Sequence, residues 1–273
     1  MSTRSKTVWI LPCCLMLLSL VVIVPLYMIV INSFKPLSEA SRLGLGMPSQ
    51  WNFDNYKSVF GEGNILQGYL NNLIIGGISI FQIVLFGSMA AYVLQRWSTK
   101  LTNFLYFFFV SGLVIPVAIV PTIKTLMDLH IHNTYRGMIA YYTAILLPFT
   151  IFLITSYIKT IPREMDESGL IDGCSYPGIF FKIIFPTITP VLITAGLISL
   201  INVWNDFMGP FYLLSDSSKW TVTISVYKYI GKYGTKWNLV FADVVAVITP
   251  ILLIYFFLQK YIVSGMTAGA IKG

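Results

Sequence analysis

Six long apolar stretches, separated by charged residues, constrain the fold of this chain more than any other feature. Each is long enough to cross a bilayer core, which is about 30 Å thick and needs roughly 20 helical residues. The fifth stretch lies between Lys182 and Asp206 and the last between Lys236 and Lys260, and between such bounding charges only the last contains a further charged residue, Asp243. We therefore expect six transmembrane helices, with spans at approximately 9–31, 69–94, 102–122, 137–158, 188–212 and 240–262.

The composition supports an all-α membrane protein with a single transmembrane domain over residues 1–273. The chain is 56% hydrophobic and only 11% charged, whereas a soluble domain carries about 25% charged residues. Its net charge is +7, but the Lys and Arg residues are spread singly and form no basic stripe. This pattern argues for lipid, and against nucleic acid, as a partner.

The N-terminus has an alternative interpretation as a signal peptide, because Arg4 and Lys6 precede an apolar run. That run continues uncharged to Phe34, which is too long for a signal core, so we interpret it as a retained span. Lys and Arg in the predicted loops number nine on each side of the membrane. The loop charges therefore leave the orientation open, with Arg4 and Lys6 favouring a cytoplasmic N-terminus.

Neither a catalytic nor a metal site is predicted. The cysteines are two adjacent residues in an apolar helix and one far away, which is unsuited to a disulfide framework or a metal site. His130 and His132 are two residues apart and would face different sides of a helix. The chain also lacks the GxxxxGK[ST] phosphate loop. An ATP-driven activity would therefore need another subunit.

The segment 161–190 is the longest charged interruption in the second half of the chain, and it predicts two short helices. Pro162 suits a first helical turn, and acidic residues at 164, 166 and 167 suit the positive end of the helix dipole. Gly173 is a natural stop. Ser175 is a candidate N-cap for a second helix, with Pro177 in its first turn. Two braced helices between spans have the form of a docking site, although an ordinary amphipathic linker would show similar signals.

The fifth predicted span contains the densest set of polar groups, Asn202, Trp204, Asn205 and Asp206. On a continuous helix, Asn202, Asn205 and Asp206 would share one face. Amide and carboxylate groups beside an aromatic ring suit sugar hydroxyls and apolar sugar faces, so these four residues are our candidate substrate pathway. The same groups could instead form hydrogen bonds between helices. Asn71, Asn72, Gln82 and Asp243 are weaker candidates for the pathway.

At segment 161–190 the sequence resembles a known motif. Glu167, Gly173, Ile183 and Pro186 have the spacing of the EAA loop of importer-type ABC permeases, with Ser168 and Gly169 in place of the two alanines. The resemblance implies a MetI-like fold with cytoplasmic EAA coupling helices that fit a cleft on an ATPase subunit. The implied ATPase-coupling residues are Glu164, Glu167, Ser168, Gly169, Asp172, Gly173, Ile183 and Pro186.

The ending YIVSGMTAGAIKG, together with WNDF in the fifth span and NSFK after the first, resembles the MalG-type permeases of carbohydrate importers. In that family the C-terminal tail enters the cleft between two ATPase subunits, which implies a cytoplasmic tail over 263–273. The implied tail contacts are Gly265, Thr267, Gly269, Lys272 and Gly273.

The resemblance implies a multi-pass subunit of a prokaryotic inner membrane, with both termini cytoplasmic, that imports a sugar or oligosaccharide. Its partners would be a second homologous permease, an ATPase dimer that binds ATP and Mg, and an external solute-binding protein. This chain would hold no cofactor and would not be an enzyme. An ion-coupled secondary transporter remains the alternative, for which internal carboxylates and broken helices would speak. An intramembrane enzyme is a third, remote possibility.

Overall fold

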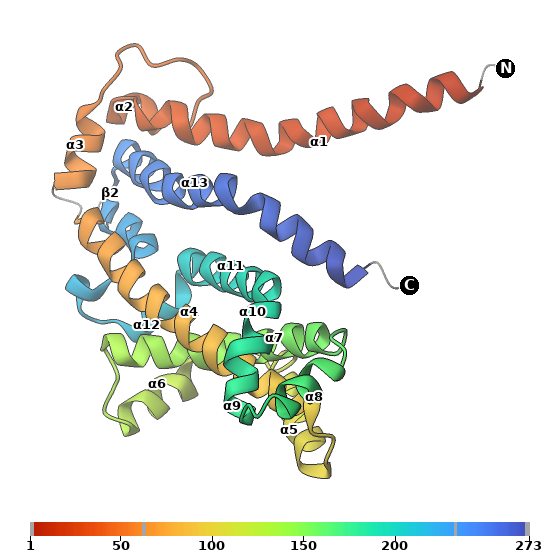
Figure 1. Ribbon diagram of the computed structural model, residues 1–273. Helices are drawn as coiled ribbons and strands as arrows, with labels where there is room; N and C mark the ends of the chain where they lie inside the picture. The colour runs from red at the N-terminus through yellow and green to blue at the C-terminus, as the bar shows by residue number, and fades with distance from the viewer. Residues whose placement is uncertain (1–2, 62–63, 232–233, 271–273) are drawn as a thin grey trace. The chain divides into compact units, whose positions relative to one another are not determined.

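The computed structural model describes residues 3–61, 64–231 and 234–270, and these are almost entirely helical (Figure 1). They form two compact units, one of residues 1–66 and 224–250 and the other of residues 67–223 and 251–273. Helices α4 (Ile65–Arg96) and α13 (Trp237–Ala270), and the 3-10 helix η3 (Val222–Tyr229), have residues in both units.

In the first unit, short helices α2 and α3 follow α1. The elements are α1 (Thr3–Ser33), α2 (Leu37–Ala40), α3 (Asp54–Gly61), and a two-stranded antiparallel pair, β1 (Ile230–Gly231) and β2 (Gly234–Thr235). Asn55 fixes α3 to the end of α1 and to the start of α13, because its amide donates to the carbonyl oxygens of Ser33 and Lys35 and its Oδ1 accepts from Asn238 at 2.7 Å.

The second unit contains the remaining elements. They are α5 (Lys100–Ser111), α6 (Ile119–Asp128), α7 (Tyr135–Ile158), α8 (Glu164–Ile171), α9 (Tyr176–Ile179), the π-helix η1 (Phe180–Ile184), α10 (Phe185–Thr187), α11 (Thr189–Asn205), α12 (Met208–Leu213) and the 3-10 helix η2 (Ser217–Lys219). One apolar core joins α4, α7, α9 and α11, and includes Ile154, Ile158, Ile179, Ile184 and Ile188.

Three described helices are long and apolar enough to cross a membrane, namely Ile65–Arg96, Tyr135–Ile158 and Trp237–Phe257. They coincide with the predicted second, fourth and sixth spans. Tyr176–Thr187 and Thr189–Asn205 meet at 76° and would count as a fourth if the bent pair is one span. In α1, the segment Leu18–Ser33 is a shorter apolar helix. The total of six spans therefore stays a prediction.

The prediction of one helix over 102–122 is wrong. Helix α5 ends at Ser111, and α6 begins only at Ile119 (Figure 1). Pro116 accounts for part of the break, because proline lacks an N–H and disfavours helical backbone in the residue before it. The span predicted over 188–212 also ends early, since α11 stops at Asn205 and Asp206 has extended backbone.

Candidate functional site

Helices α8 and α9 occupy the segment in which two short helices are predicted. The first turn of α8 carries Glu164, Asp166 and Glu167, although the helix begins after Pro162 rather than at it. Gly173 has φ +77°, a left-handed conformation that glycine adopts without strain. Ser175 caps α9 and accepts a hydrogen bond from the N–H of Gly178 at 3.4 Å.

Most of the coupling residues implied by the family resemblance are exposed. The exposed ones are Glu164, Glu167, Ser168, Asp172, Gly173 and Pro186. Gly169 is buried instead, and a β-carbon there would lie 2.7 Å from Ile183 Cδ1 and 3.0 Å from Ile179 Cγ1. Gly169, named above among the implied ATPase-coupling residues, therefore lets α8 approach Ile183 and Ile179 of its own chain.

An apolar patch at the end of α8 was not predicted. Leu170 is 43% exposed and Ile171 is 87% exposed, while Tyr176 at the start of α9 is 52% exposed. These three residues, which we call the α8 tip, lie beside the turn at Gly173. Solvent-exposed apolar clusters on polar segments are typical of binding surfaces. A Leu-Ile pair directly before a helix stop was the available sequence signal.

Asp166, the second of the three acidic side chains of α8, points inward. Asp166 Oδ1 accepts a hydrogen bond of 2.7 Å from the hydroxyl of Tyr92, and Asp166 Oδ2 lies 2.8 Å from Arg96 Nη2. The latter contact is an ion pair without the angles of a hydrogen bond. Both charged side chains are largely buried, at 7% and 15% exposure. Arg96 also donates to the carbonyl oxygen of Ile161 at 3.2 Å.

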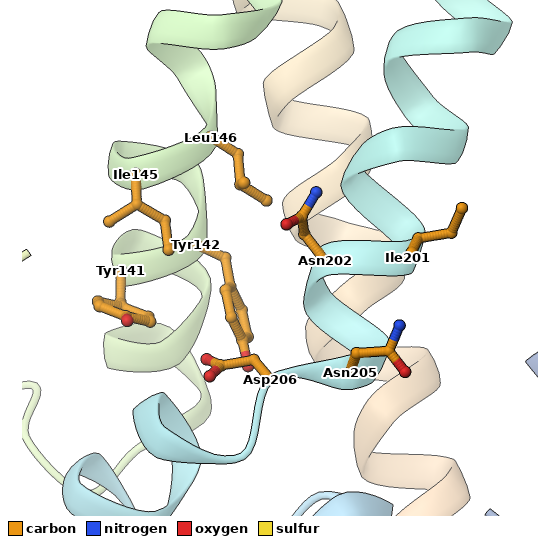
Figure 2. Close-up of a pocket in the computed structure, with 8 residues that line it drawn as sticks. All are labelled: Tyr141, Tyr142, Ile145, Leu146, Ile201, Asn202, Asn205 and Asp206. Carbon is orange, nitrogen blue, oxygen red and sulfur yellow. The ribbon is translucent and has the colours of Figure 1, made fainter. Parts of the chain in front are cut away.

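An open pocket of about 360 Å³ lies between α7 and the end of α11 (Figure 2). Asn202, Asn205 and Asp206 line it, so the structure brings together three of the four predicted pathway residues. Its opposite wall consists of Tyr141, Tyr142, Ile145 and Leu146 of α7, which the sequence did not single out. Ligand pockets are commonly about 300–1,000 Å³ and combine apolar walls with a few polar groups.

Trp204, the fourth predicted pathway residue, does not line this pocket. Its side chain is buried, and its ring stacks on Tyr69 of α4 with centroids 6.2 Å apart. Its ring therefore takes no part in this pocket, and its contact with a substrate stays a prediction. The physical reason is the helical period, which turns residue 204 away from the face shared by residues 202 and 205. Tyr141 and Tyr142 of α7 are the aromatic residues that line this pocket (Figure 2).

Asp206 has two different oxygen environments. Its Oδ1 accepts the N–H of Gly209 at 3.1 Å and so satisfies a backbone donor at the start of α12. Its Oδ2 is buried, as is the hydroxyl of Tyr142, and within the described residues neither atom has a hydrogen bond of normal geometry. Figure 2 shows the carboxylate beside that hydroxyl at the bottom of the pocket. Buried polar atoms without partners are rare in native proteins, so this pair needs an explanation.

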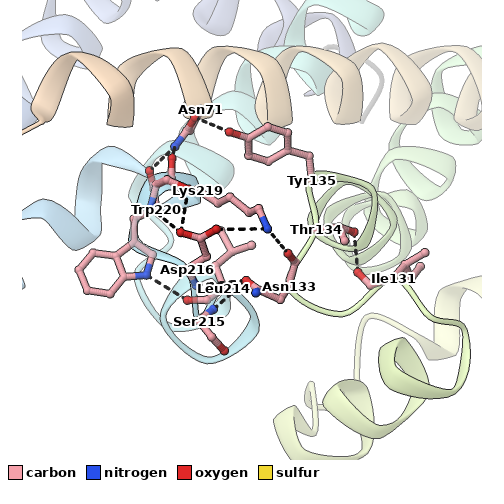
Figure 3. Close-up of polar contacts among 11 residues, drawn as sticks. Asn71, Ile131, Asn133, Thr134, Tyr135, Leu214, Ser215, Asp216, Lys219 and Trp220 are labelled. Atoms are coloured by element: carbon pink, nitrogen blue, oxygen red, sulfur yellow. Dashed lines mark hydrogen bonds and ion pairs between the residues drawn. The ribbon is translucent and has the colours of Figure 1, made fainter.

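Asn71, a weaker pathway candidate, belongs to a structural network (Figure 3). Its amide donates to the carbonyl oxygens of Ser218 and Trp220, and its Oδ1 accepts from the hydroxyl of Tyr135 at 2.8 Å. These bonds use the polar atoms of Asn71 within the protein. Asn72, Gln82 and Asp243 likewise accept from Val222, Thr143 and Ser225. Inter-segment hydrogen bonding is therefore the role that the structure gives these residues.

The same network joins the loops after α6 and α12. Lys219 Nζ donates to the carbonyl oxygen of Asn133 at 2.9 Å and lies 3.4 Å from Asp216 Oδ2. The hydroxyl and N–H of Ser218 both donate to Asp216, and these bonds lower the pKa of the Asp216 carboxyl below its ordinary value. The loop after α12 is thus fixed to the loop before α7 (Figure 3).

The predicted tail contacts lie at or beyond the last described residues of the chain. Lys272 and Gly273 are outside the described residues. At Gly265, Thr267 and Gly269 only the backbone is described, and it continues α13. Among the described residues, no group of His, Cys, Asp and Glu could hold a metal ion.

Solved structures define the class of fold. The structure resembles a crystal structure of a bacterial ABC transporter that imports the acidic polysaccharide alginate, with a TM-score of 0.84, 20% identity, and coverage of 96% of this chain and 98% of that one. It also resembles the inward-facing MetNI methionine ABC transporter, with a TM-score of 0.54, 18% identity, and coverage of 74% and 95%. The fold is that of an ABC importer permease.

The chain belongs to the family described as "Binding-protein-dependent transport system inner membrane component", which matches residues 83–268. It is 30% identical to the melibiose/raffinose/stachyose import permease protein MelC of Bacillus subtilis, over 100% of this chain and 99% of that protein. It is 31% identical to the diacetylchitobiose uptake system permease protein NgcG of Streptomyces coelicolor, over 94% and 87%. Its membership of this family and its long apolar helices identify the chain as a multi-pass permease of the inner membrane.

Proposed function

We propose that this chain is a transmembrane permease subunit of an ATP-driven ABC importer for a sugar or oligosaccharide. The single observation that carries the proposal is the alignment with sugar permeases over nearly the whole length of both chains. A second homologous permease, an ATPase dimer that binds ATP and Mg, and a solute-binding protein complete the assembly. The ion-coupled alternative is disfavoured, because membership of a binding-protein-dependent family places the chain in a different class of transporter.

The proposal assigns the surface of α8 and α9 to the ATPase subunits. The acidic residues Glu164 and Glu167 are exposed there, next to the apolar α8 tip. A cleft on an ATPase would cover the apolar atoms and pair with the carboxylates at its rim, the usual arrangement of an interface. This assignment makes α8 and α9 cytoplasmic and, with six spans, places both termini and the tail 263–273 on the same side.

The pocket between α7 and α11 is our proposed substrate pathway. Asn202 and Asn205 offer amide groups, and Asp206 Oδ2 is a buried acceptor beside the hydroxyl of Tyr142. Tyr141 and Tyr142 line the opposite wall as largely buried rings, at 9% and 1% exposure, so they shape the pocket more than they offer an open ring face. Sugars present hydroxyl donors on their edges and C–H groups on their faces, so this combination suits them. Such a pathway would alternate its access as the ATPases close, through rigid-body movement of packed helices.

Purification of the complex, followed by assay in proteoliposomes, tests the proposal. We expect this chain to co-purify with ATPase subunits, and uptake of radiolabelled raffinose or of another α-galactoside or glucan to require internal ATP. Uptake should continue after an ionophore collapses the ion gradients. ATP-independent uptake that stops with the gradient would overturn the proposal.

The docking surface can be tested separately with a charge on the α8 tip. Ile171→Glu should reduce co-purification of the ATPase subunits, because it places a carboxylate in the apolar part of the interface. Met47→Glu is the matched control, since Met47 is also an exposed apolar residue, at 68%, in the loop after α2. Full retention of the ATPases by the Ile171 variant would exclude the α8 tip from the interface.

A further inference from the structure

The contact between α4 and α8 is unlike the other ion pairs of the described residues. The pairs Lys57–Asp54 and Lys124–Asp128 each lie within one helix and are exposed, and Lys219–Asp216 lies within one loop. The Arg96–Asp166 pair is largely buried and joins residues 70 positions apart in the sequence, because 166 − 96 = 70. Exposed pairs contribute little to structure, whereas a buried pair fixes the relative position of its two elements.

Three contacts on one short segment of α4 hold α8. Tyr92 and Arg96 are one helical turn apart near the C-terminal end of α4, so both reach the same carboxylate. Tyr92 binds Asp166 Oδ1, and Arg96 faces Asp166 Oδ2. Arg96 also binds the carbonyl oxygen of Ile161, just before α8. The four residues form what we call the α4–α8 clasp.

Aromatic contacts extend the clasp to α9. The ring of Tyr92 lies edge-on to Trp97 with centroids 5.6 Å apart, and Trp97 lies edge-on to Tyr176 at 5.2 Å. Tyr92 also contacts Phe180 at 5.5 Å. The end of α4 is therefore attached to both helices of the proposed docking surface, by polar bonds to α8 and by rings to α9.

We propose that Tyr92, Arg96 and Asp166 are positioning residues that make α8 move as one body with the membrane-spanning helix α4. This inference rests on the proposed function, in which α8 binds an ATPase subunit. When ATP closes the ATPase dimer and displaces α8, the clasp transfers that displacement to α4. Asp166 therefore acts inside the protein, while the neighbouring Glu164 and Glu167 remain exposed for the partner.

A fluorescent reporter on α4 gives a test that does not require the transported sugar. In a chain whose native cysteines, including the free Cys174, are replaced by serine, a bimane label at Phe81→Cys would sit on α4, outside the clasp, because Phe81 is 65% exposed. In the complete complex, ATP with vanadate should change its emission. Tyr92→Phe, which removes one hydroxyl and keeps the ring, and Asp166→Asn should each reduce that change at least about fivefold, the lower end of usual coupling between sites.

Asp128→Asn is the matched control, because it removes an exposed ion pair of the same unit and should leave the emission change intact. Both clasp variants should still co-purify with the ATPase subunits and support their basal ATP hydrolysis. A full emission change in both clasp variants would overturn the proposal. So would loss of the ATPases from Tyr92→Phe, because the clasp would then shape the docking surface rather than transmit its movement.

The proposed function and the clasp proposal would be overturned by different results. A wild-type chain that never co-purifies with an ATPase would overturn that function before any clasp variant is made. A wild-type complex that binds ATPases but shows no emission change at α4 would overturn the clasp proposal alone.

Discussion

Two aspartates of the same compact unit, Asp166 and Asp206, have opposite surroundings. Asp166 lies in the first turn of α8, where a tyrosine hydroxyl and an arginine contact its two oxygens. Asp206 follows the last turn of α11, and only one of its oxygens accepts a hydrogen bond among the described residues. A carboxylate whose oxygens are both occupied holds parts of the protein together. A carboxylate with a buried oxygen that meets only a tyrosine hydroxyl, and no cation, at the wall of a pocket is suited to a ligand.

The packing around the two aspartates also differs, because it is tight near Asp166 and open near Asp206. Near Asp166, Gly169 is in contact with Ile179 and Ile183, and there is no room for a further atom. Near Asp206, the pocket leaves about 360 Å³ open. Substitutions on α8 should therefore reduce uptake by disturbing the packing of the protein. Substitutions at the end of α11 should reduce uptake by weakening substrate binding. Four predictions test this contrast, beginning with the largest expected effect.

Gly169→Leu should abolish uptake, with a decrease of roughly 100-fold or more. Its β-carbon would lie 2.7 Å from Ile183 Cδ1 and 3.0 Å from Ile179 Cγ1, so these side chains must shift, and the further atoms of leucine would push α8 away from α9 and η1. Overpacking of this kind costs about 1–3 kcal/mol and displaces backbone. Uptake and ATPase co-purification would both be measured. Gly46→Leu is the control, because no atom lies within 4 Å of a β-carbon at Gly46. Normal uptake by the Gly169 variant would show that α8 does not need this close approach.

Asp206→Asn should raise the KM for sugar uptake about tenfold, because a hydrogen bond to a charged group contributes about 1.5–3 kcal/mol. The amide oxygen can still accept from Gly209, so the start of α12 should be preserved. ATPase co-purification should be unchanged, in contrast to the effect of Gly169→Leu. Asp54→Asn, at an exposed residue of α3, is the control. An unchanged KM in the Asp206 variant would remove this carboxylate from the substrate pathway.

Trp204→Phe should have a smaller effect on transport. Trp204 is buried against Tyr69 and lies outside the pocket, so we expect KM to change by less than about twofold, while the thermal midpoint of the complex falls because buried ring atoms are lost. Fluorescence-detected thermal unfolding and uptake kinetics would be compared. A large change in KM without a change in the midpoint would support the prediction that this ring contacts substrate.

The smallest effect is expected at Asp216, which lies in a loop outside the spans. Its pKa is lowered by the bonds from the Ser218 hydroxyl and N–H. A carboxyl with a lowered folded-state pKa stabilises the fold above its ordinary pKa, about 3.9, and this contribution is lost as the pH falls through the lowered value. The thermal midpoint should therefore decrease slightly more in wild type than in Ser218→Ala when the pH falls below about 4. Equal decreases of the thermal midpoint in wild type and in Ser218→Ala would contradict this contribution.

Local signals in the sequence predict much of the fold. The apolar stretches predict α4, α7 and α13, because a helix that crosses a bilayer needs only length and few charges. Gly173 and Ser175 predict a turn and a helix start, since a positive φ and a capping hydroxyl are properties of single residues.

The remaining features depend on contacts between distant residues. The end of α11 at Asp206 is held by Thr223, whose hydroxyl donates to the Asp206 carbonyl oxygen at 2.9 Å, and the apolar run through Pro210 conceals that end. Tyr141 and Tyr142 face the pocket only because α7 packs beside α11. The pairing of Asp166 with Arg96 could not be read from residues 70 positions apart, so Asp166 seemed equivalent to the exposed acidic residues beside it.

The 76° bend between Tyr176–Thr187 and Thr189–Asn205 has a mechanical consequence. The shorter arm is about 18 Å long at 1.5 Å per residue, so turning α11 by about 10° around its own axis would move the far end of that arm by about 3 Å. The bend therefore amplifies movement. A small rotation of α11 about its own axis displaces the far end of the shorter arm by about the diameter of an atom.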